Sequence, residues 1–592
     1  MVAEETGNPL DQAPARPPFS QNALTVLGER YFRRDSNGVP IEDVDRMLAR
    51  VAGAIAEPGR LYGDDNHFWE ARFLERMQRR EFLPNSPTLM NAGLPGGQLA
   101  ACFVLPVEDD LDSIFATLAH TARIHQTGGG TGFSFSSLRP ADDRVRSTGG
   151  IASGPISFIE LFDHATAVIR QGGRRRGANM AVLRIDHPDI EAFINAKRSP
   201  GRLENFNLSV GITDAFFAAL DAHSPFSLRN PRTGRMTRTV NAEDLFNAIA
   251  EAAWAVGDPG LLFLDEINRH NPTAALGRIE ATNPCGEQPL LPYESCTLGS
   301  INLAEFSDGI NVDWQKLKGV IRDAVVFLDN VIDANCYPLS EIEAATRKTR
   351  KIGLGVMGFA DLLARIGIGY DSDYGVNLGA TIASFLTDEA RAVSRWLGEK
   401  RGSFPAFRAK GGGRAGISCL RNAAVTCVAP TGTLSLIAGV SSGIEPFFAL
   451  AFSRRVLNGE RLIEVNPLVQ TELERLNLAG KDALVAIKKI GSLRHIKGLP
   501  ETTRRRFPIA LEIAPEWHVR MQAAFQDHVD AAVSKTVNLP ADAPMSAARE
   551  VFTLARKLHL KGITVYRYGS RLDQTLSLIE EGAGPDCREC AV

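Results

Sequence analysis

The sequence has little of three things: long apolar runs, cysteine and net charge. No apolar run approaches the length needed to span a bilayer, and the polar, proline-rich start lacks the apolar core of a signal peptide, so we expect a cytoplasmic protein. The 66 basic and 69 acidic residues leave a net charge of -3, which gives no reason to expect general attraction to nucleic acid or anionic membranes. Eight cysteines among 592 residues are too few for a disulfide scaffold, so each is either a small buried hydrophobe or a chemical group.

What is present is an alternation of strand-like and helix-like segments. Apolar residues recur at helical spacing from residue 23 to about residue 80, which predicts a small helical region after a disordered start. From about residue 82 to residue 570, short apolar runs alternate with amphipathic stretches, which predicts an α/β architecture with largely parallel strands. The last residues, rich in glycine and proline and ending with two cysteines, predict a mobile tail. We therefore divide the chain at residues 1–80, 81–572 and 573–592. The expected strands are Met180–Ile185, Phe206–Thr213, Leu261–Asp265, Thr297–Leu303, Ala424–Ala429, Ser534–Leu539 and Ile563–Tyr568.

One short segment combines three chemically useful side chains. Asn283-Pro284-Cys285-Gly286-Glu287 contains proline and glycine, so a loop is expected there. In an extended loop, residues two apart point the same way, and the amide, the thiol and the carboxylate could converge on one ligand. Alone, the segment fits a surface loop with a structural cysteine equally well. Two further cysteines, Cys102 in an apolar run and Cys296 shortly after the loop, make it more specific.

These three cysteines, with the Asn-x-Cys-x-Glu loop, resemble the active site of ribonucleotide reductases, in particular of the adenosylcobalamin-dependent class. The resemblance implies a ten-stranded α/β barrel with Cys285 on a finger loop inside it, a small helical region before it and a flexible redox tail after it. It also implies a homodimer. Further similar stretches are FLPNSPTLMNAG (82–93), QTGGGTGFSFSSLRP (126–140), GGRRRGANMAVL (172–183), CVAPTGTLSLIAGVSSGIEPFF (427–448) and KGITVYRYGSR (561–571).

The resemblance also implies a role for each residue of the site. Cys285 would become a thiyl radical, with adenosylcobalamin as the radical source, and would take the 3′ hydrogen of a ribonucleotide. Glu287 would act as the base on the 3′-hydroxyl, and Asn283 would hold a substrate hydroxyl. Cys102 and Cys296 would supply two electrons and a proton to the departing 2′-oxygen and finish as a disulfide. The family favours ribonucleoside diphosphates over triphosphates as substrates. No protein side chain is expected to ligate a metal ion.

The cysteine pair at the end of the chain suits the regeneration of these thiols. A zinc site would need two more ligands at similar spacing near Cys587 and Cys590, and the sequence has none there. A Cys-x-x-Cys pair after a glycine- and proline-containing lead-in suits thiol–disulfide exchange. The family uses such a tail, and a thioredoxin-like reductant would recharge it.

A second motif predicts phosphate binding. The segment from Pro430 to Ser435 follows a strand-like run and precedes a helical pattern, so its backbone N–H groups and hydroxyls could hold an anion. An ordinary capped helix is the more common meaning of Thr-Gly-Thr, and the family context favours the substrate phosphate. The full expected substrate-binding set is Ser86, Ala101, Cys102, Gly130, Asn283, Pro284, Cys285, Gly286, Glu287, Pro430, Thr431, Gly432, Thr433 and Leu434.

The resemblance further implies regulation of substrate choice by dNTP effectors. Asp109, Leu111 and Arg139 match an effector pocket of the family. The loop 172–179, with three consecutive arginines, is similar to the loop that relays effector identity, although an arginine run is usually a solvated surface. The short N-terminal region leaves no room for a complete ATP-cone domain, so we expect no overall inhibition by dATP.

Three alternatives remain at this point. A class I large subunit would use two adjacent tyrosines near the end of the barrel, but here Arg567 separates Tyr566 from Tyr568. A non-catalytic nucleotide-binding relative would not be expected to keep all the cysteines. A glycyl-radical enzyme would want a C-terminal glycine loop instead of a Cys-x-x-Cys pair. The Gly-x-Gly-x-x-Gly match at residues 353–358 lacks a preceding apolar strand, which indicates tight backbone packing instead of dinucleotide binding.

Overall fold

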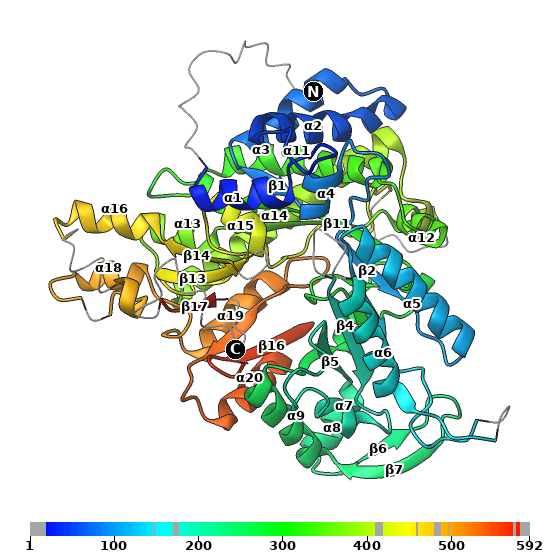
Figure 1. Cartoon of the computed structure of the whole chain (residues 1–592). Coiled ribbons are helices and arrows are strands. Elements are labelled where there is room, and N and C mark those ends of the chain that lie inside the picture. The colour runs from blue at the N-terminus through cyan, green and yellow to red at the C-terminus, as the bar shows by residue number, and fades with distance from the viewer. Residues whose placement is uncertain are drawn as a thin grey trace.

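The computed structural model describes residues 19–145, 149–169, 177–408, 418–456, 460–478, 487–494, 496–571 and 576–579 (Figure 1). The predicted tail pair Cys587 and Cys590, and the arginine run at 174–176, lie outside the described residues. Within the described ranges, no helix is both long enough and apolar enough to cross a membrane.

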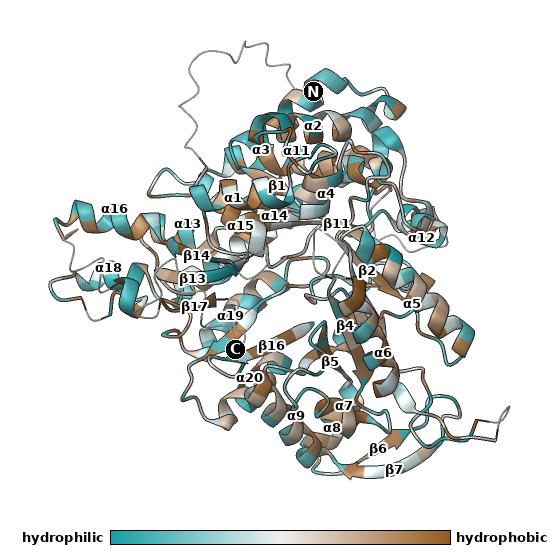
Figure 2. Cartoon of the chain, in the orientation of Figure 1, coloured by the Kyte–Doolittle hydropathy of each residue, from teal (hydrophilic) through white to brown (hydrophobic). Residues whose placement is uncertain are grey.

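The expected helical region is present at the N-terminal end of the described chain. Its elements are α1 (Gln21–Arg30), α2 (Val44–Ala56), η1 (Glu57–Tyr62) and α3 (Asn66–Gln78). Ser20, Asp43 and Asp65 cap the three α-helices by accepting backbone N–H groups of the first turns. The buried apolar face of α2 packs in one core with α11 (Trp314–Ala334), so this region is continuous with the barrel (Figure 2).

The centre of the molecule is a ten-stranded sheet built from two parallel sets. The first set runs β2–β3–β4–β5–β8, all parallel. In the second set, β11 is parallel to β12, and β15 is parallel to β16. The sets meet antiparallel where β11 pairs with β2 and where β16 pairs with β8. Their bounds are β2 (Cys102–Leu105), β3 (Gly130–Ser134), β4 (Asn179–Arg184), β5 (Phe206–Ile212), β8 (Gly260–Phe263), β11 (Ser295–Asn302), β12 (Ile352–Met357), β15 (Thr536–Leu539) and β16 (Gly562–Arg567).

Two isolated parallel bridges close this sheet into a barrel. Leu354 of β12 pairs with Thr426, and Val428 pairs with Val533, which directly precedes β15. The segment 424–429, predicted as a strand, therefore fills the gap between β12 and β15. The tenth strand of the hydrogen-bonded sheet, β1 (Phe82–Pro84), adds to β11 outside this ring. The predicted α/β barrel is confirmed.

Helices cover the outside of the barrel (Figure 1). The main ones besides α11 are α5 (Leu111–Gln126), α6 (Gly154–Ile169), α9 (Ala242–Val256), α14 (Asp373–Arg401), α19 (Pro515–Gln526) and α20 (Met545–Lys557). The shorter helices are α4 (Ser86–Asn91), α7 (Ile190–Ile194), α8 (Asp214–Asp221), α10 (Leu264–Arg269), η2 (Ala274–Leu276), η3 (Leu303–Glu305), α12 (Ser340–Thr349), α13 (Phe359–Arg365), η4 (Pro405–Arg408), α15 (Gly432–Ala438), α16 (Pro467–Arg475) and α18 (Glu501–Arg506). The remaining strands are β6 (Pro225–Arg229), β7 (Met236–Asn241), β9 (Ala281–Thr282), β10 (Pro289–Leu290), β13 (Ala451–Val456), β14 (Glu460–Val465) and β17 (Leu576–Ser577).

The glycine motif at 353–358 lies on β12 and packs against backbone, as expected. A Cβ on Gly355 would lie 2.4 Å from the carbonyl oxygen of Cys427, so only glycine allows this approach. The motif itself is a buried strand. Its glycines thus bring β12 close to the segment 424–429 that closes the barrel.

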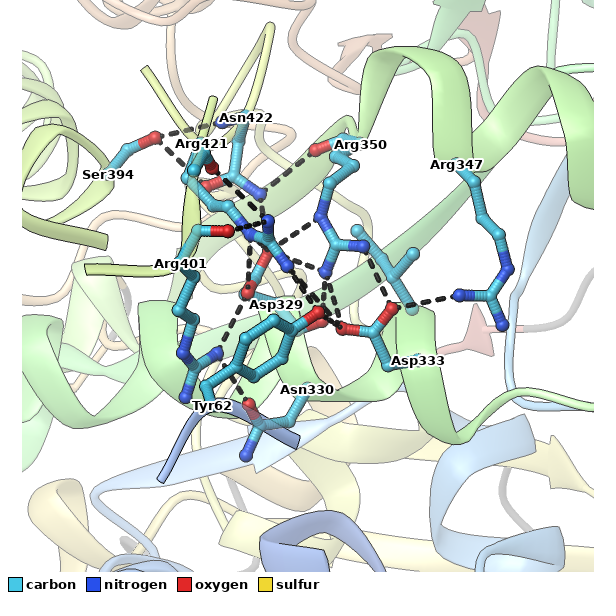
Figure 3. Close-up of polar contacts among 12 residues, drawn as sticks. Tyr62, Asp329, Asn330, Asp333, Arg347, Arg350, Ser394, Arg401, Arg421 and Asn422 are labelled. Atoms are coloured by element: carbon cyan, nitrogen blue, oxygen red, sulfur yellow. Dashed lines mark hydrogen bonds and ion pairs between the residues drawn. The ribbon is translucent and has the colours of Figure 1, made fainter. Parts of the chain in front are cut away.

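A buried ionic network fastens the helical region to the barrel (Figure 3). Asp329 of α11 accepts hydrogen bonds from Arg350 at 2.8 Å, Arg401 at 2.9 Å and Arg421 at 3.1 Å. Tyr62, the last residue of η1, donates to Asp333 one turn further along α11 at 2.9 Å. Burial raises the pKa of Asp329, but the three guanidinium groups outweigh it and hold that pKa far below its ordinary value.

Candidate active site

The predicted finger loop connects β9 and β10 inside the barrel. Gly132 of β3 makes room for it, because a Cβ there would lie 1.7 Å from the carbonyl oxygen of Thr282. Asn207 of β5 donates to the carbonyl of Pro284 at 2.8 Å. From the opposite side, the N–H of Ala532 donates to the carbonyl of Glu287 at 2.9 Å. Both parallel sets of strands therefore fix the loop.

The loop is a tight turn and not the extended segment that the spacing suggested. Gly286 has a φ of +81°, and its N–H donates to the carbonyl of Asn283 at 3.1 Å. The amide oxygen of Asn283 accepts from the N–H of Gln288 at 3.0 Å. As a result, Asn283 and Glu287 both reach Cys102, whereas Cys285 at the tip is exposed. The expected convergence thus holds for the amide and the carboxylate, and the thiol of Cys285 points into an open cavity.

The other two cysteines lie directly opposite each other. Cys102 on β2 and Cys296 on β11 are register partners in the antiparallel pair, and both are buried. Opposed residues of such a pair have Cα atoms roughly 4.5–5.5 Å apart, within the range that a disulfide spans. The amide of Asn283 donates to Cys102 Sγ at 3.1 Å, and Glu287 Oε1 lies 3.8 Å from the same sulfur.

Burial decides the protonation of this pair. It raises the pKa of both thiols, and the carboxylate of Glu287 raises the pKa of Cys102 further. The two cysteines are therefore held as neutral thiols at ordinary pH, in the protonated form that can supply hydrogen.

The cavity at Cys285 has a volume of about 440 Å³ and is open on one side. Pro284, Gly286 and several hydrogen-bonding side chains line it, among them Asn207, Ser209, Ser534, Asn538 and Tyr566. This mixture suits a nucleoside, which has an apolar base and several hydroxyls. The residues that line this cavity could hold the nucleoside part of adenosylcobalamin.

The predicted phosphate turn begins α15 in an unusual conformation. Thr431 has a φ of +55°, and its hydroxyl accepts from the N–H of Gly443 at 2.8 Å instead of capping the helix. The commoner reading, an ordinary side-chain cap, is therefore wrong. Pro430, Gly432, Thr433 and Leu434 surround this turn. Among the other expected substrate contacts, Ala101 accepts from the N–H of Gly130 at 2.9 Å beside Cys102, and the Ser86 hydroxyl lies 2.7 Å from that of Tyr31.

Two of the three expected effector residues are in contact. Arg139 Nε lies 2.9 Å from both carboxylate oxygens of Asp109, and the N–H of Arg139 also donates to it at 3.1 Å. This hydrogen bond raises the pKa of Arg139. Leu111, in the first turn of α5, is 61% exposed and so does not contribute to the core.

Sequence reasoning missed several residues around the cysteines. Cys427 is buried in the same apolar cluster as Cys102 and Cys296. A buried pair of Glu294 and Lys351 lies beside Cys296. Glu294 could have been noticed from its position two residues before Cys296, which places it on the same face of a strand.

Comparison with known proteins identifies the family. Residues 100–415 and 414–566 match the description "Ribonucleotide reductase, barrel domain", and residues 18–97 match "Ribonucleotide reductase, all-alpha domain". The chain belongs to the ribonucleotide reductase family. The barrel described above is thus the reductase barrel, and the N-terminal helices belong to the all-alpha domain.

Similar proteins agree. A vitamin B12-dependent ribonucleoside-diphosphate reductase of Mycobacterium tuberculosis (strain ATCC 25618 / H37Rv) is 54% identical over 567 residues, covering 94% of this chain and 79% of that protein. One from Thermoplasma acidophilum is 49% identical, covering 90% of this chain and 71% of that protein. The Actinobacillus ureae class Id ribonucleotide reductase alpha subunit has the same fold, with a TM-score of 0.76, 22% identity and coverage of 93% of this chain and 97% of that one.

Proposed function

We propose that this ribonucleotide reductase converts ribonucleoside diphosphates to 2′-deoxyribonucleotides with adenosylcobalamin as its radical source. The observation that carries the proposal is the arrangement of three cysteines: Cys285 is exposed to a cavity, and the opposed pair Cys102 and Cys296 is buried beside it. The relatives at 49–54% identity, named vitamin B12-dependent ribonucleoside-diphosphate reductases, support both the cofactor and the diphosphate substrate.

Each residue of the loop has a chemical task in this reaction. The Cys285 thiyl radical removes the 3′ hydrogen of the ribose, and the carboxylate of Glu287 holds the proton of the 3′-hydroxyl. Loss of the 2′-hydroxyl as water takes one proton from the pair Cys102 and Cys296, and reduction of C2′ takes the two electrons and the second proton. The two cysteines end as a disulfide, and Cys285 returns the hydrogen to C3′, which restores its thiyl radical. Asn283, which contacts the sulfur of Cys102 at 3.1 Å, orients that thiol and the substrate hydroxyl. The enclosing barrel shields these groups from solvent.

The cofactor supplies homolytic chemistry, and the chain supplies the position of the sulfur that receives the radical. The residues that would hold its nucleoside part are those lining the cavity at Cys285, in particular Asn207, Ser534 and Asn538. A class I large subunit is not favoured, because the most similar relatives named above are vitamin B12-dependent. Substrate phosphates would bind at Pro430, Thr431, Gly432, Thr433 and Leu434.

A dithiol completes the cycle. We assign this role to Cys587 and Cys590, recharged by a thioredoxin-like protein in the cytoplasm. The support comes from the last described residues: β17 pairs with β13, and Leu576 of β17 lines the same cavity as Cys285. The chain therefore runs past the opening of the active site shortly before the two cysteines.

Two regulatory features belong to the same proposal. Asp109, Leu111 and Arg139 would bind a dNTP effector that selects the substrate base.

The neighbouring helices α5 and α6 expose Leu111, Phe115 and Val168, which are 61%, 52% and 63% exposed. We assign this apolar face to a homodimer contact.

The test is an activity assay with the purified chain in dim light. Adenosylcobalamin and a dithiol are added with the four ribonucleoside diphosphates, then with the triphosphates, each with and without dNTP effectors. We expect cobalamin-dependent deoxynucleotide from the diphosphates, and none from Cys285→Ser. Absence of product with both substrate series, from folded protein, would contradict the proposal, and activity that needs a metal-bearing second protein would replace it with the class I reading.

A further inference from the structure

A buried ion pair lies against the redox cysteines without a part in the reaction above. Lys351 Nζ is 2.7 Å from Glu294 Oε2, and both side chains are 3% exposed. The N–H of Leu291 and the hydroxyl of Thr349 each donate to Glu294 at 2.8 Å. A buried pair of this kind is costly in desolvation and contributes little to stability by itself, so its position suggests another use.

The strand register places the pair in one row with the two cysteines. Cys102 opposes Cys296 across β2 and β11. On the other side of β11, Thr297 is aligned with Ile352 of β12, so the residue next to Cys296 is Lys351. Cys296 Sγ lies 3.7 Å from the carbonyl oxygen of Lys351. Register neighbours project from the same face of a sheet, which brings the ammonium group to the side of the thiol.

The conformation just before Lys351 is held by the network in Figure 3. Arg350 has a φ of +46°, which is strained for a residue with a side chain. Its guanidinium binds Asp329 and Asp333 at 2.8 Å each, and its carbonyl accepts from the amide of Asn422 at 3.0 Å. These contacts fix the turn that delivers Lys351 to β12.

The two cysteines of the couple therefore have different surroundings. Cys102 contacts Asn283 and Glu287 on the loop whose tip opens to the cavity. Cys296 is equally buried, and its sulfur lies 3.5 Å from the carbonyl oxygen of Thr297 and 3.7 Å from that of Lys351. Burial raises the pKa of Cys296, and the charge of Lys351 is the largest influence in the opposite direction, ahead of the opposing carboxylates of Glu287 and Glu294. At Cys102, burial and Glu287 act in the same direction, against a negative charge.

We propose that Lys351 is a positioning residue of the redox couple: its buried ammonium stabilises negative charge on Cys296, so that Cys296 is the sulfur that leaves when the Cys102–Cys296 disulfide is reduced. A thiolate of the reducing dithiol enters through the cavity and attacks Cys102. The Cys102–Cys296 bond breaks, and its electron pair stays on Cys296. The second thiol of the dithiol then displaces Cys102, the dithiol ends as a disulfide, and both cysteines take up a proton. A better-stabilised leaving thiolate leaves faster. This inference rests on the proposed role of the cysteine pair.

The experiment uses the full-length protein oxidised with diamide, with the Cys102–Cys296 disulfide confirmed by peptide mass mapping. Its reduction by dithiothreitol is followed at pH 7 in the parent, in Lys351→Met and in Lys351→Met/Glu294→Gln. We expect a rate loss of about tenfold in the single variant, as for removal of a nearby charge at a protein-like dielectric. The double variant should lie between it and the parent, since it also removes the opposing carboxylate. A packing defect would not produce this order.

A monothiol, glutathione, shows which sulfur is attacked. We expect the trapped mixed disulfide on Cys102 in the parent and a share on Cys296 in Lys351→Met. The matched control is Lys197→Met, which removes another buried ion pair, that with Asp258 at 2.9 Å, and should keep the parental rate and site of attack. If both Lys351 variants are reduced at the parental rate, or if glutathione attacks Cys296 in the parent, this inference is wrong while the proposed function still stands. Failure of the Cys102–Cys296 disulfide to form would overturn the proposed function with it.

Discussion

Two buried polar clusters of this molecule differ in how their charges are satisfied. In the cluster around Asp329, three arginines surround one carboxylate, and the pKa of that carboxylate is far below its ordinary value (Figure 3). In the cluster around Cys102, a carboxylate lies beside thiols whose pKa values are raised. The first cluster has fixed charges and stabilises the fold. The second holds neutral thiols beside a carboxylate, the groups to which we assign the exchange of protons and electrons.

The largest effect is expected for Glu287→Gln in the reactive cluster. Loss of the proposed base should lower the rate of deoxynucleotide formation by about 10²- to 10⁴-fold. The free energy of unfolding should not fall, because a neutral amide is easier to bury than a carboxylate. Product assays and urea denaturation measure the two. The control is Glu160→Gln, whose side chain is 44% exposed. An active Glu287→Gln protein would remove the distinction between the clusters.

The converse is expected for Asp329→Asn. Three arginines lose their buried counter-charge, which should reduce the free energy of unfolding by about 3–5 kcal/mol. The activity of the folded fraction should fall far less than in Glu287→Gln. The pKa of Asp329 is lower in the folded protein than in the unfolded chain. The stabilisation from its carboxylate is therefore complete above the pKa of the unfolded chain, and it is lost as the pH falls from that value toward the folded pKa. Asp214→Asn, 65% exposed and paired with Arg269, is the control; equal urea midpoints for both variants would contradict this prediction.

A smaller effect on stability is expected from His125, a titratable group that burial keeps neutral. Burial lowers the pKa of His125 to about 4, and its ring lies 2.9 Å from the hydroxyl of Thr131 on β3. The unfolded chain then binds this proton first, so stability falls as the pH drops from the ordinary histidine value toward 4. Between pH 7 and pH 5 the loss from this group should be about 2 kcal/mol. The free energy of unfolding is measured by urea denaturation of the parent and of His125→Gln at pH 7 and pH 5. Between these pH values the parent should lose about 2 kcal/mol more than His125→Gln. An equal loss in the two proteins would contradict the prediction.

The smallest effect on stability is expected at the pair of Arg139 and Asp109, whose side chains are 22% and 21% exposed. Arg139→Ala should change the free energy of unfolding by only about 1 kcal/mol, because water still screens a partly exposed ion pair. The choice among four competing ribonucleoside diphosphates should nevertheless stop responding to added dNTPs. Arg202→Ala, which removes the exposed pair with Glu160, serves as the control. A normal effector response in Arg139→Ala would place the effector site elsewhere.

Much of the barrel could be predicted from sequence because its central strands are buried on both faces. Met180–Ile185 and Phe206–Thr213 were expected as strands and correspond to β4 and β5. The strand β12 was not expected, since its glycines lower strand propensity and serve close packing instead. The run around Cys102 was not among the expected strands, yet it forms β2.

The residues of the proposed site could be named from the sequence, but their geometry could not. The cysteines, Asn283 and Glu287 are recognisable as a motif, but the turn that separates Cys285 from its neighbours depends on a single backbone conformation at Gly286. The partnership of Lys351 with Glu294 depends on register between strands that are far apart in sequence. Such long-range alignment is set by the closure of the barrel and leaves no local pattern.

The opposition of Cys102 and Cys296 has a mechanical consequence. β2 belongs to one parallel set of strands and β11 to the other, so a disulfide between them would cross one of the two seams of the barrel. A cross-link that closes a loop of more than a hundred residues restricts the unfolded chain by about 4–5 kcal/mol. The oxidised protein would thus resist unfolding more than the reduced one. In each catalytic cycle this cross-link between the two sets of strands would form and be reduced again. The free energy of unfolding of the resting enzyme would therefore report whether the cysteine pair is oxidised or reduced.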